Sequence, residues 1–515
     1  MSTSSLKNPQ TQAQTQAGSQ SRSRSFSKIL APLLLVISAG AVGAGTLAVA
    51  QQSSATPNTA VSMISVSSLA EPALSQEQLD KHIASFEYVW RSVKEKHWDP
   101  DLNGVDWDQA REDLLPKIKE ASSDGEARGV INELLARLGQ SHFGIIPSSS
   151  YERLEEESKE LELDDEESED ESTDFKDDEP IEESDDPGWL GMNARLIGDR
   201  FLVTRVFPGS PAQAAGIKTG WIIDSIQDRK MSSLIELSKD IDGVMRPETQ
   251  AGLIAHSRLQ GNEGKSVRMT LIDGQNKEQE VKMTFDKAPG VMGGFGELPP
   301  MPIEVEATTL DLGDDEGIGY FRLSMFMSPG TVLPTYQQFI KDHMDSRGIV
   351  IDMRGNFGGI ILMAPGMINW LIEEKGLMGT MKMRDAVRGA FDIPLMLNPR
   401  KNAYKGKVAV LIDEMSISNA EILSAGLKDI GRARIFGTQT AGLALPSTVE
   451  RLPNGDGFQY AFADYTSSGG YSLEAQGTIP DVPINYTREG LLSGQDEVLD
   501  AATDWILSDE PVQVD

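Results

Sequence analysis

Two short stretches of the chain combine residue types that can bind an anion and supply a nucleophile. Residues 352–359 read DMRGNFGG and follow an apolar run, so backbone N–H groups of the glycine turn can point at an anion. Residues 415–422 read MSISNAEI after a second apolar run and place Ser418 at the start of a helix. The helix dipole favours a developing negative charge there, and the first N–H groups lack partners within the helix.

Each stretch also has an ordinary structural interpretation. Ser418 can be a plain N-cap, with Glu421 three residues later completing a capping box. The glycine turn can be a plain connection from strand to helix. A serine hydroxyl also needs a base within hydrogen-bond reach to be a useful nucleophile. Neither stretch therefore indicates an enzyme by itself.

The periodicity of apolar residues indicates which elements carry these stretches. Apolar residues from Ile83 to Val93 recur at three- and four-residue spacing, which predicts an amphipathic helix beginning near Ser75. Two further helices are expected at about 107–121 and 127–138.

The pattern changes twice further along the chain. Residues 188–288 favour short strands, with a hairpin at Asp273-Gly274. A Gly/Pro-rich linker follows, and beyond it strands and helices alternate, which predicts a mainly α/β core.

Composition limits the classes of function. The 515 residues are enough for two or three domains, and the formal net charge of −32 would repel a nucleic-acid backbone. The chain has no cysteine, which excludes disulfides, thiolate catalysis and cysteine-ligated zinc. We therefore expect no nucleic-acid partner. No metal and no cofactor are expected either, because a reaction at a serine nucleophile requires neither.

Two segments are expected to lie outside the folded domains. Residues 152–186 hold 21 acidic and three basic residues, with too few apolar groups to fold, and predict a solvated disordered insert rather than a weak calcium site. Near the N-terminus, Arg22, Arg24 and Lys28 precede an apolar run at 29–50 that ends in Ala-Val-Ala. This pattern is typical of a secretory signal peptide, with an uncleaved membrane anchor as the alternative. Either predicts a periplasmic or other extracytoplasmic protein.

Residues 188–288 resemble a PDZ domain, through the stretch VFPGSPAQAAGIKTGWIIDSI at 206–226. The resemblance implies a domain that adds a peptide strand to its sheet edge and holds a terminal carboxylate on backbone N–H groups. Trp189, Leu190, Gly191 and Met192 stand where the carboxylate-binding loop would be. They could instead only plug the hydrophobic face of the first strand.

Residues 76–505 as a whole resemble the C-terminal processing (tail-specific) peptidase family, which includes the tricorn protease core. DMRGNFGG matches its glycine turn, SISNAEILSAGLKDIGRARIFGTQTAG at 416–442 its nucleophile helix, and LEAQGTIPDVPI at 473–484 a segment near its C-terminus. The resemblance implies a multidomain α/β protein with an N-terminal helical region, a PDZ-like β-rich domain and a C-terminal α/β core of tail-specific protease (ClpP/crotonase-like) type. The expected divisions are a signal peptide or anchor at 1–50, a flexible tether at 51–73, a helical domain at 74–150, the acidic insert at 151–187, the PDZ-like domain at 188–288, a linker at 289–303 and the catalytic core at 304–507.

The resemblance assigns the nucleophile to Ser418, but the chain departs from the serine–lysine members of the family. Leu443 stands where those members carry their base lysine, and a leucine cannot accept a proton. Lys428 lies on the nucleophile's own helix, about three turns away, and is a poor substitute.

The tricorn-like branch of the family instead uses a histidine from a Ser-His pair before the PDZ insert, together with a late glutamate. Ser141-His142 and Glu474 stand at those places. The resemblance therefore predicts His142 as the base, because imidazole takes and returns a proton near neutrality, with Ser141 relaying to Glu474.

The oxyanion hole is expected from backbone N–H groups. Asn419 is one candidate and Gly358 the other, with Gly359 as an alternative.

The predicted function is that of an exported serine endopeptidase that hydrolyses protein or peptide substrates and engages C-terminal segments through its PDZ-like domain. Membrane contact is expected only through the N-terminal segment, and the sequence does not indicate an oligomeric state. Two rival interpretations stay open. One is an inactive peptide-binding scaffold, suggested by the missing lysine, and the other is a peptidase that uses Lys428 as its base.

Overall fold

The computed structural model describes residues 73–149, 187–227, 229–239, 245–294, 298, 301–311, 317–385 and 389–512. The predicted signal segment, nearly all of the tether and the predicted acidic insert lie outside these residues. Within the described ranges, no helix is both long enough and apolar enough to cross a bilayer.

The N-terminal region is helical, as predicted. Its elements are α1 (Gln76–Lys96), a 3₁₀ turn (Leu102–Gly104), α2 (Trp107–Lys119) and α3 (Asp124–Ala136). The side chains of Ser75, Asp106 and Ser123 each accept an N–H from the first turn of the following helix, which explains where the three helices begin. Apolar side chains such as Phe86 and Leu114 are fully buried between the helices.

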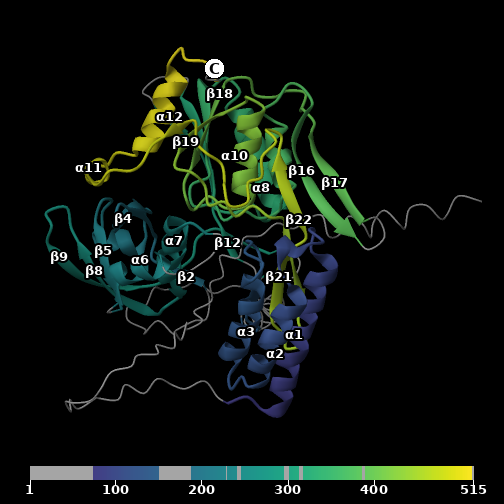
Figure 1. The fold of residues 1–515 in the computed structure, drawn as a ribbon. Helices are drawn as coiled ribbons and strands as arrows, with labels where there is room; N and C mark the ends of the chain where they lie inside the picture. Colours follow the sequence, from purple (N-terminus) through teal and green to yellow (C-terminus); the bar gives the residue numbers. More distant parts are fainter. Residues whose placement is uncertain are drawn as a thin grey trace, which may run out of the picture. The chain divides into compact units, whose positions relative to one another are not determined.

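A hairpin from late in the chain completes this helical region (Figure 1). Strand β1 (Gly144–Ile146) pairs with β21 (Gly457–Ala461), which pairs in turn with β20 (Ser447–Arg451), all antiparallel. Arg128 of α3 forms a two-pronged ion pair, both bonds 2.9 Å, with the buried carboxylate of Asp456. Because β1 begins two residues after His142, this pairing ties the predicted base to the C-terminal part of the chain.

The next region has the mainly β pattern expected of residues 188–288. Its main sheet has the order β3-β4-β5-β8-β9, with β8 and β9 forming the hairpin predicted at Asp273-Gly274. Strand β3 is an edge of this sheet, and helix α7 packs against it. The elements are β2 (Pro187–Trp189), β3 (Met192–Ile197), β4 (Arg200–Val206), α5 (Pro211–Ala214), β5 (Ile222–Ile226), β6 (Arg229–Lys230), α6 (Met231–Lys239), α7 (Pro247–Arg258), β7 (Gln260–Asn262), β8 (Ser266–Ile272), β9 (Glu278–Thr284) and β10 (Asp286–Lys287).

The segment expected to be a plain linker contains two short strands. β11 (Val291–Gly293) and β12 (Met301–Ile303) pair antiparallel. Gly290 lets two segments of the chain approach closely here, because a Cβ at this position would lie 2.2 Å from the carbonyl oxygen of Ile303.

The C-terminal region is an α/β core around a six-stranded sheet of order β13-β14-β15-β18-β19-β23 (Figure 1). Five of these strands run parallel, and β13 is an antiparallel edge. The core elements are β13 (Val305–Leu310), β14 (Ile318–Leu323), α8 (Pro329–Asp342), β15 (Gly348–Asp352), α9 (Met363–Ile368), β16 (Gly376–Asp385), β17 (Gly389–Leu397), β18 (Lys407–Ile412), α10 (Asn419–Asp429), β19 (Arg434–Gly437), β22 (Ala463–Ser467), β23 (Val482–Pro483), α11 (Arg488–Leu492) and α12 (Glu497–Leu507).

Neighbouring parallel strands bring the two chemical stretches together. β15 runs into the glycine turn and the adjacent β18 runs into the segment that holds Ser418. Ligands of parallel sheets bind at the carboxyl ends of the strands, where the connecting loops meet.

Candidate active site

Ser418 lies where the loop after β18 turns into α10. Its backbone has φ 56° and ψ −117°, a conformation that residues other than glycine rarely adopt. The residue is fully buried, and its Oγ makes no hydrogen bond to any residue that the structure describes. Its N–H donates both to the carbonyl oxygen of Leu443 at 2.9 Å and to a carboxylate oxygen of Glu421 at 2.8 Å. The backbone of this serine is therefore held firmly, while its hydroxyl is free of protein partners.

The carboxylate of Glu421 does more than cap the helix. Besides the Ser418 N–H, it accepts hydrogen bonds from Thr440 Oγ1 and the Gly442 N–H, both at 2.7 Å, and from the Leu443 N–H at 3.0 Å. Burial raises the pKa of Glu421 to about 7, against the opposing effect of these four hydrogen bonds. This side chain thus joins the head of α10 to the loop 440–443.

The predicted glycine turn lies directly against Ser418. Gly358 has φ +85°, and a Cβ there would lie 2.6 Å from the Ser418 Cβ. The N–H of Gly358 donates to Asn356 Oδ1 at 2.8 Å. By contrast, the N–H groups of Gly359 and Asn419 donate no hydrogen bond to any part of the chain that the structure describes. These two are the unoccupied donors among the three predicted ones.

The predicted Ser-His pair and the late glutamate are in contact. Ser141 Oγ lies 2.7 Å from His142 Nδ1 and 2.8 Å from Glu474 Oε2, and the Ser141 N–H donates to Glu474 Oε1 at 2.7 Å. A carboxylate only accepts hydrogen bonds, so the hydroxyl proton of Ser141 goes to Glu474. Ser141 Oγ must then accept from His142 Nδ1–H, which leaves Nε2 with its lone pair free.

The relay formed by His142, Ser141 and Glu474 is linked to Ser418 through one short loop, residues 443–444. The N–H of Ala444 donates to Glu474 Oε2 at 3.1 Å, and its neighbour Leu443 accepts the Ser418 N–H. His142 Nε2 and Ser418 Oγ are both buried, and neither makes a hydrogen bond to the other or to another residue in the described ranges. Catalytic hydrogen bonds are often long before substrate binds and tighten in the complex.

Burial changes the acid–base properties of this relay. It lowers the pKa of His142 to about 3, so the imidazole is neutral near pH 7. Burial also raises the pKa of Glu474, opposed by hydrogen bonds from Ser141 and Ala444. An imidazole with so low a pKa is a weak base, and ionised Glu474, acting through Ser141, is the group placed to stabilise its cation.

The lysine alternatives do not reach this site. The side chain of Leu443 is buried and apolar, and its carbonyl oxygen accepts the Ser418 N–H. Lys428 lies in the last turn of α10, where its Nζ is 2.9 Å from Asp481 and donates to the Ile479 carbonyl at 2.7 Å.

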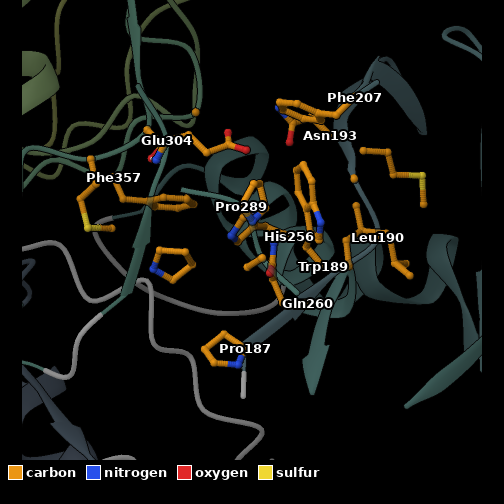
Figure 2. Close-up of a pocket in the computed structure, with 18 of the residues that line it drawn as sticks. Pro187, Trp189, Leu190, Asn193, Phe207, His256, Gln260, Pro289, Glu304 and Phe357 are labelled. Carbon is orange, nitrogen blue, oxygen red and sulfur yellow. The ribbon is translucent and has the colours of Figure 1, made fainter. Parts of the chain in front are cut away.

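The predicted carboxylate-binding loop lines a cavity of about 260 Å³ (Figure 2). The carbonyls of Leu190 and Gly191 accept hydrogen bonds from the segment 207–212. Their own N–H groups donate to no residue that the structure describes. Phe357 and Met415 of the core also line the cavity. Phe357 immediately precedes Gly358 in the chain, so the cavity adjoins the glycine turn.

The core thus combines a parallel sheet, a glycine turn and a serine at the head of a helix, an arrangement that suits nucleophilic catalysis. The family comparison is more specific. Residues 317–484 match the model of Peptidase family S41, and residues 81–136 match that of the Tricorn protease C1 domain. Residues 317–484 therefore form a Peptidase family S41 domain, as the sequence motifs predicted.

Curated relatives support the same family at low identity. The chain is 23% identical over 296 residues to a probable CtpA-like serine protease of Staphylococcus haemolyticus, covering 57% of this chain and 52% of the relative. It is 23% identical over 437 residues to a carboxyl-terminal-processing protease of Picosynechococcus, covering 82% of this chain and 89% of the relative. The chain thus spans about half the length of the staphylococcal relatives.

A solved structure shows the same fold over most of the chain. The crystal structure of mature CPAF is 13% identical, covers 85% of this chain and all of its own, and has a TM-score of 0.58. The predicted multidomain α/β fold is confirmed.

Sequence reasoning did not identify Asp413 as part of the site. Its Oδ1 accepts the N–H of Gly355 at 2.9 Å and of Met415 at 3.0 Å, and its Oδ2 accepts Arg195 Nε at 2.7 Å. One carboxylate therefore holds the beginnings of both chemical loops and an arginine of β3. An aspartate directly after an apolar strand was the available signal.

Proposed function

We propose that this protein is a serine endopeptidase with Ser418 as nucleophile and His142 as general base. One observation carries the proposal: Ser418 Oγ and His142 Nε2 are both buried and have no partner among the described residues, and the same loop, 443–444, binds the Ser418 N–H and the Glu474 carboxylate that holds Ser141 beside His142. The S41 family match supports it. Ser141 and Glu474 set the tautomer of the imidazole.

In the proposed reaction, Ser418 Oγ attacks the carbonyl carbon of the peptide bond while its proton passes to His142 Nε2. The carbonyl oxygen becomes an oxyanion beside the N–H groups of Gly359 and Asn419, and each such donor lowers the barrier by about 3 kcal/mol. The bond to nitrogen then breaks, and His142 returns the proton to the departing amine. Water hydrolyses the acyl-enzyme by the same route, which restores Ser418.

We further propose that residues 188–288 act as a PDZ-like domain that binds a C-terminal segment of the substrate. The open edge of β3 beside α7 suits the addition of a peptide strand. The free N–H groups of Leu190 and Gly191 suit a terminal carboxylate. A Cβ on Gly191, which has φ +73°, would lie 2.0 Å from the Ser210 Cβ.

The Gly191→Ala variant tests this part of the proposal. The variant should bind a peptide with a free C-terminus at least tenfold more weakly than the native protein does. The native protein should bind the C-terminally amidated form of that peptide as weakly as the variant binds the free form. Fluorescence anisotropy with both peptides gives the measurement. Equal affinity of the native protein for the two peptides would contradict carboxylate capture.

A serine-directed fluorophosphonate probe tests the nucleophile. The native protein should be labelled and Ser418→Ala should not be, and hydrolysis of fluorescently labelled casein should disappear in both Ser418→Ala and His142→Ala. A native protein that is neither labelled nor active would favour the inactive scaffold. Full activity of His142→Ala would favour a different base.

We also propose that the protein acts outside the cytoplasm and that its domains follow the divisions predicted from the sequence. The basic and apolar pattern at 22–50 supports the location. Cell fractionation checks it, and a cytoplasmic protein would contradict it.

A further inference from the structure

A second buried histidine lies beside the predicted base. His97 follows the last residue of α1 and is 1% exposed. Its Nε2 lies 2.8 Å from Gln140 Oε1 and its ring stacks on Phe143, with centroids 5.6 Å apart and planes inclined by 16°. Gln140 and Phe143 flank the pair Ser141-His142 directly. One side chain therefore contacts the residues on both sides of the pair.

His97 is itself held in place by several of the described residues. Its Nδ1 lies 3.0 Å from the backbone nitrogen and 2.9 Å from the carbonyl oxygen of Asp99. The face of the ring also packs against Trp98, with centroids 5.5 Å apart. The backbone N–H of His97 donates to the carbonyl oxygen of Val93 in α1 at 3.0 Å. With Gln140 Oε1 as acceptor, Nε2 carries a proton and donates it.

The residues that His97 contacts need such support. His142 has φ 63°, a left-handed conformation that costs energy for any residue other than glycine and persists only where the surroundings impose it. Residues 140–143 belong to no helix or strand. Glu474 holds the Ser141 N–H. His97 supports the residues before and after the pair, Gln140 and Phe143.

We propose that His97 is a positioning residue of the active site, which holds Gln140 and Phe143 and so aims the imidazole of His142 at Ser418. This inference rests on the proposed function of His142 as the base. The contacts of His97 are to the residues that flank the pair, so it would act on the reaction only through them.

The test compares His97→Phe with a matched control. His97→Phe keeps an aromatic ring for stacking but removes both ring nitrogens. His82→Phe makes the same change at a buried histidine within α1, whose ring contacts Asp124 at 2.6 Å and Asn454 at 3.0 Å. If both histidines were merely structural, both variants would lower the melting temperature and leave kcat unchanged.

The expected result is a kcat for casein hydrolysis about 10- to 100-fold lower in His97→Phe, with KM within twofold of the native value and His82→Phe near the native kcat. Gln140→Met removes the acceptor from the loop side without touching the helices, and should reproduce the loss even if His97→Phe folds poorly. The double variant should lose no more than either single one, because both remove the same interaction.

The outcomes separate this inference from the proposed function. If His142→Ala is inactive while Gln140→Met keeps the native kcat, His97 does not act through this loop and only the present inference fails. If His142→Ala keeps its activity, the proposed base is wrong and the positioning role falls with it. A lower kcat that is additive in the double variant also overturns the inference.

Discussion

Removal of one hydroxyl group tests the proposed relay most directly. In Ser141→Ala the Nδ1–H of His142 loses its acceptor, while the Ser141 N–H still donates to Glu474, since that contact comes from the backbone. The overall placement of the loop should therefore survive. What changes is the tautomer of the imidazole and the path by which Glu474 stabilises its cation.

The expected magnitude follows from the buried geometry. Leaving a buried donor without a partner costs about 1–3 kcal/mol, which corresponds to roughly 5- to 150-fold in rate when it falls on the transition state. The lost stabilisation of the imidazolium by Glu474 adds to this cost. We therefore expect kcat to fall by about 100-fold in Ser141→Ala, with KM little changed, since Ser141 is not expected to contact the substrate.

The assay is steady-state hydrolysis of labelled casein, together with the rate of fluorophosphonate labelling at Ser418. Ser424→Ala is a suitable control, because Ser424 is a buried serine of α10 that hydrogen-bonds Thr478 and the helix backbone, away from the relay. The control should lose stability but keep its kcat. A Ser141→Ala protein within threefold of the native kcat would refute the relay.

Three further results are expected. Gly358→Ala should abolish activity, because the new Cβ would meet Ser418 at 2.6 Å, and a folded variant with native kcat would count against the placement of the glycine turn. Lys428→Ala should keep its activity, since that lysine pairs elsewhere, and an inactive but folded variant would revive the lysine-based reaction. Activity should fall as the pH is lowered through the raised pKa of Glu474, above the ordinary value of 4.5, while His142, with a pKa of about 3, is still neutral. The pH–rate profile of Glu474→Gln should lack that acidic decline.

Local patterns in the sequence predicted local structure well. The helix that begins near Ser75, the helix start at Ser418, the alternation of strands and helices after 302 and the hairpin at 273–274 all follow from short-range chemistry that a few neighbouring residues decide. The motifs around Ser418 and the glycine turn also led to the S41 family. These features depend on backbone conformation and on periodicity, and both are readable from adjacent residues.

Contacts between distant segments required the tertiary structure. The sequence suggested Ser141 and Glu474 only by resemblance, and their hydrogen bonds join residues 333 positions apart. It described Glu421 as a cap, whereas the folded chain makes it the acceptor for a second loop.

The glycine turn shows the same limit at shorter range. The sequence favoured Gly358 as the donor, with Gly359 as the alternative, but Asn356 occupies the N–H of Gly358 and leaves that of Gly359 without a described partner.

The sequence by itself thus determined the serine at a helix head, the glycine turn beside a strand and the order of the regions. The tertiary structure alone decided which N–H groups are left unpaired, which carboxylates hold the loops and how His97 contacts the pair it flanks. The physical reason is that propensities and caps act over a few residues, while the pairing of buried polar groups depends on which segments the packed core brings together.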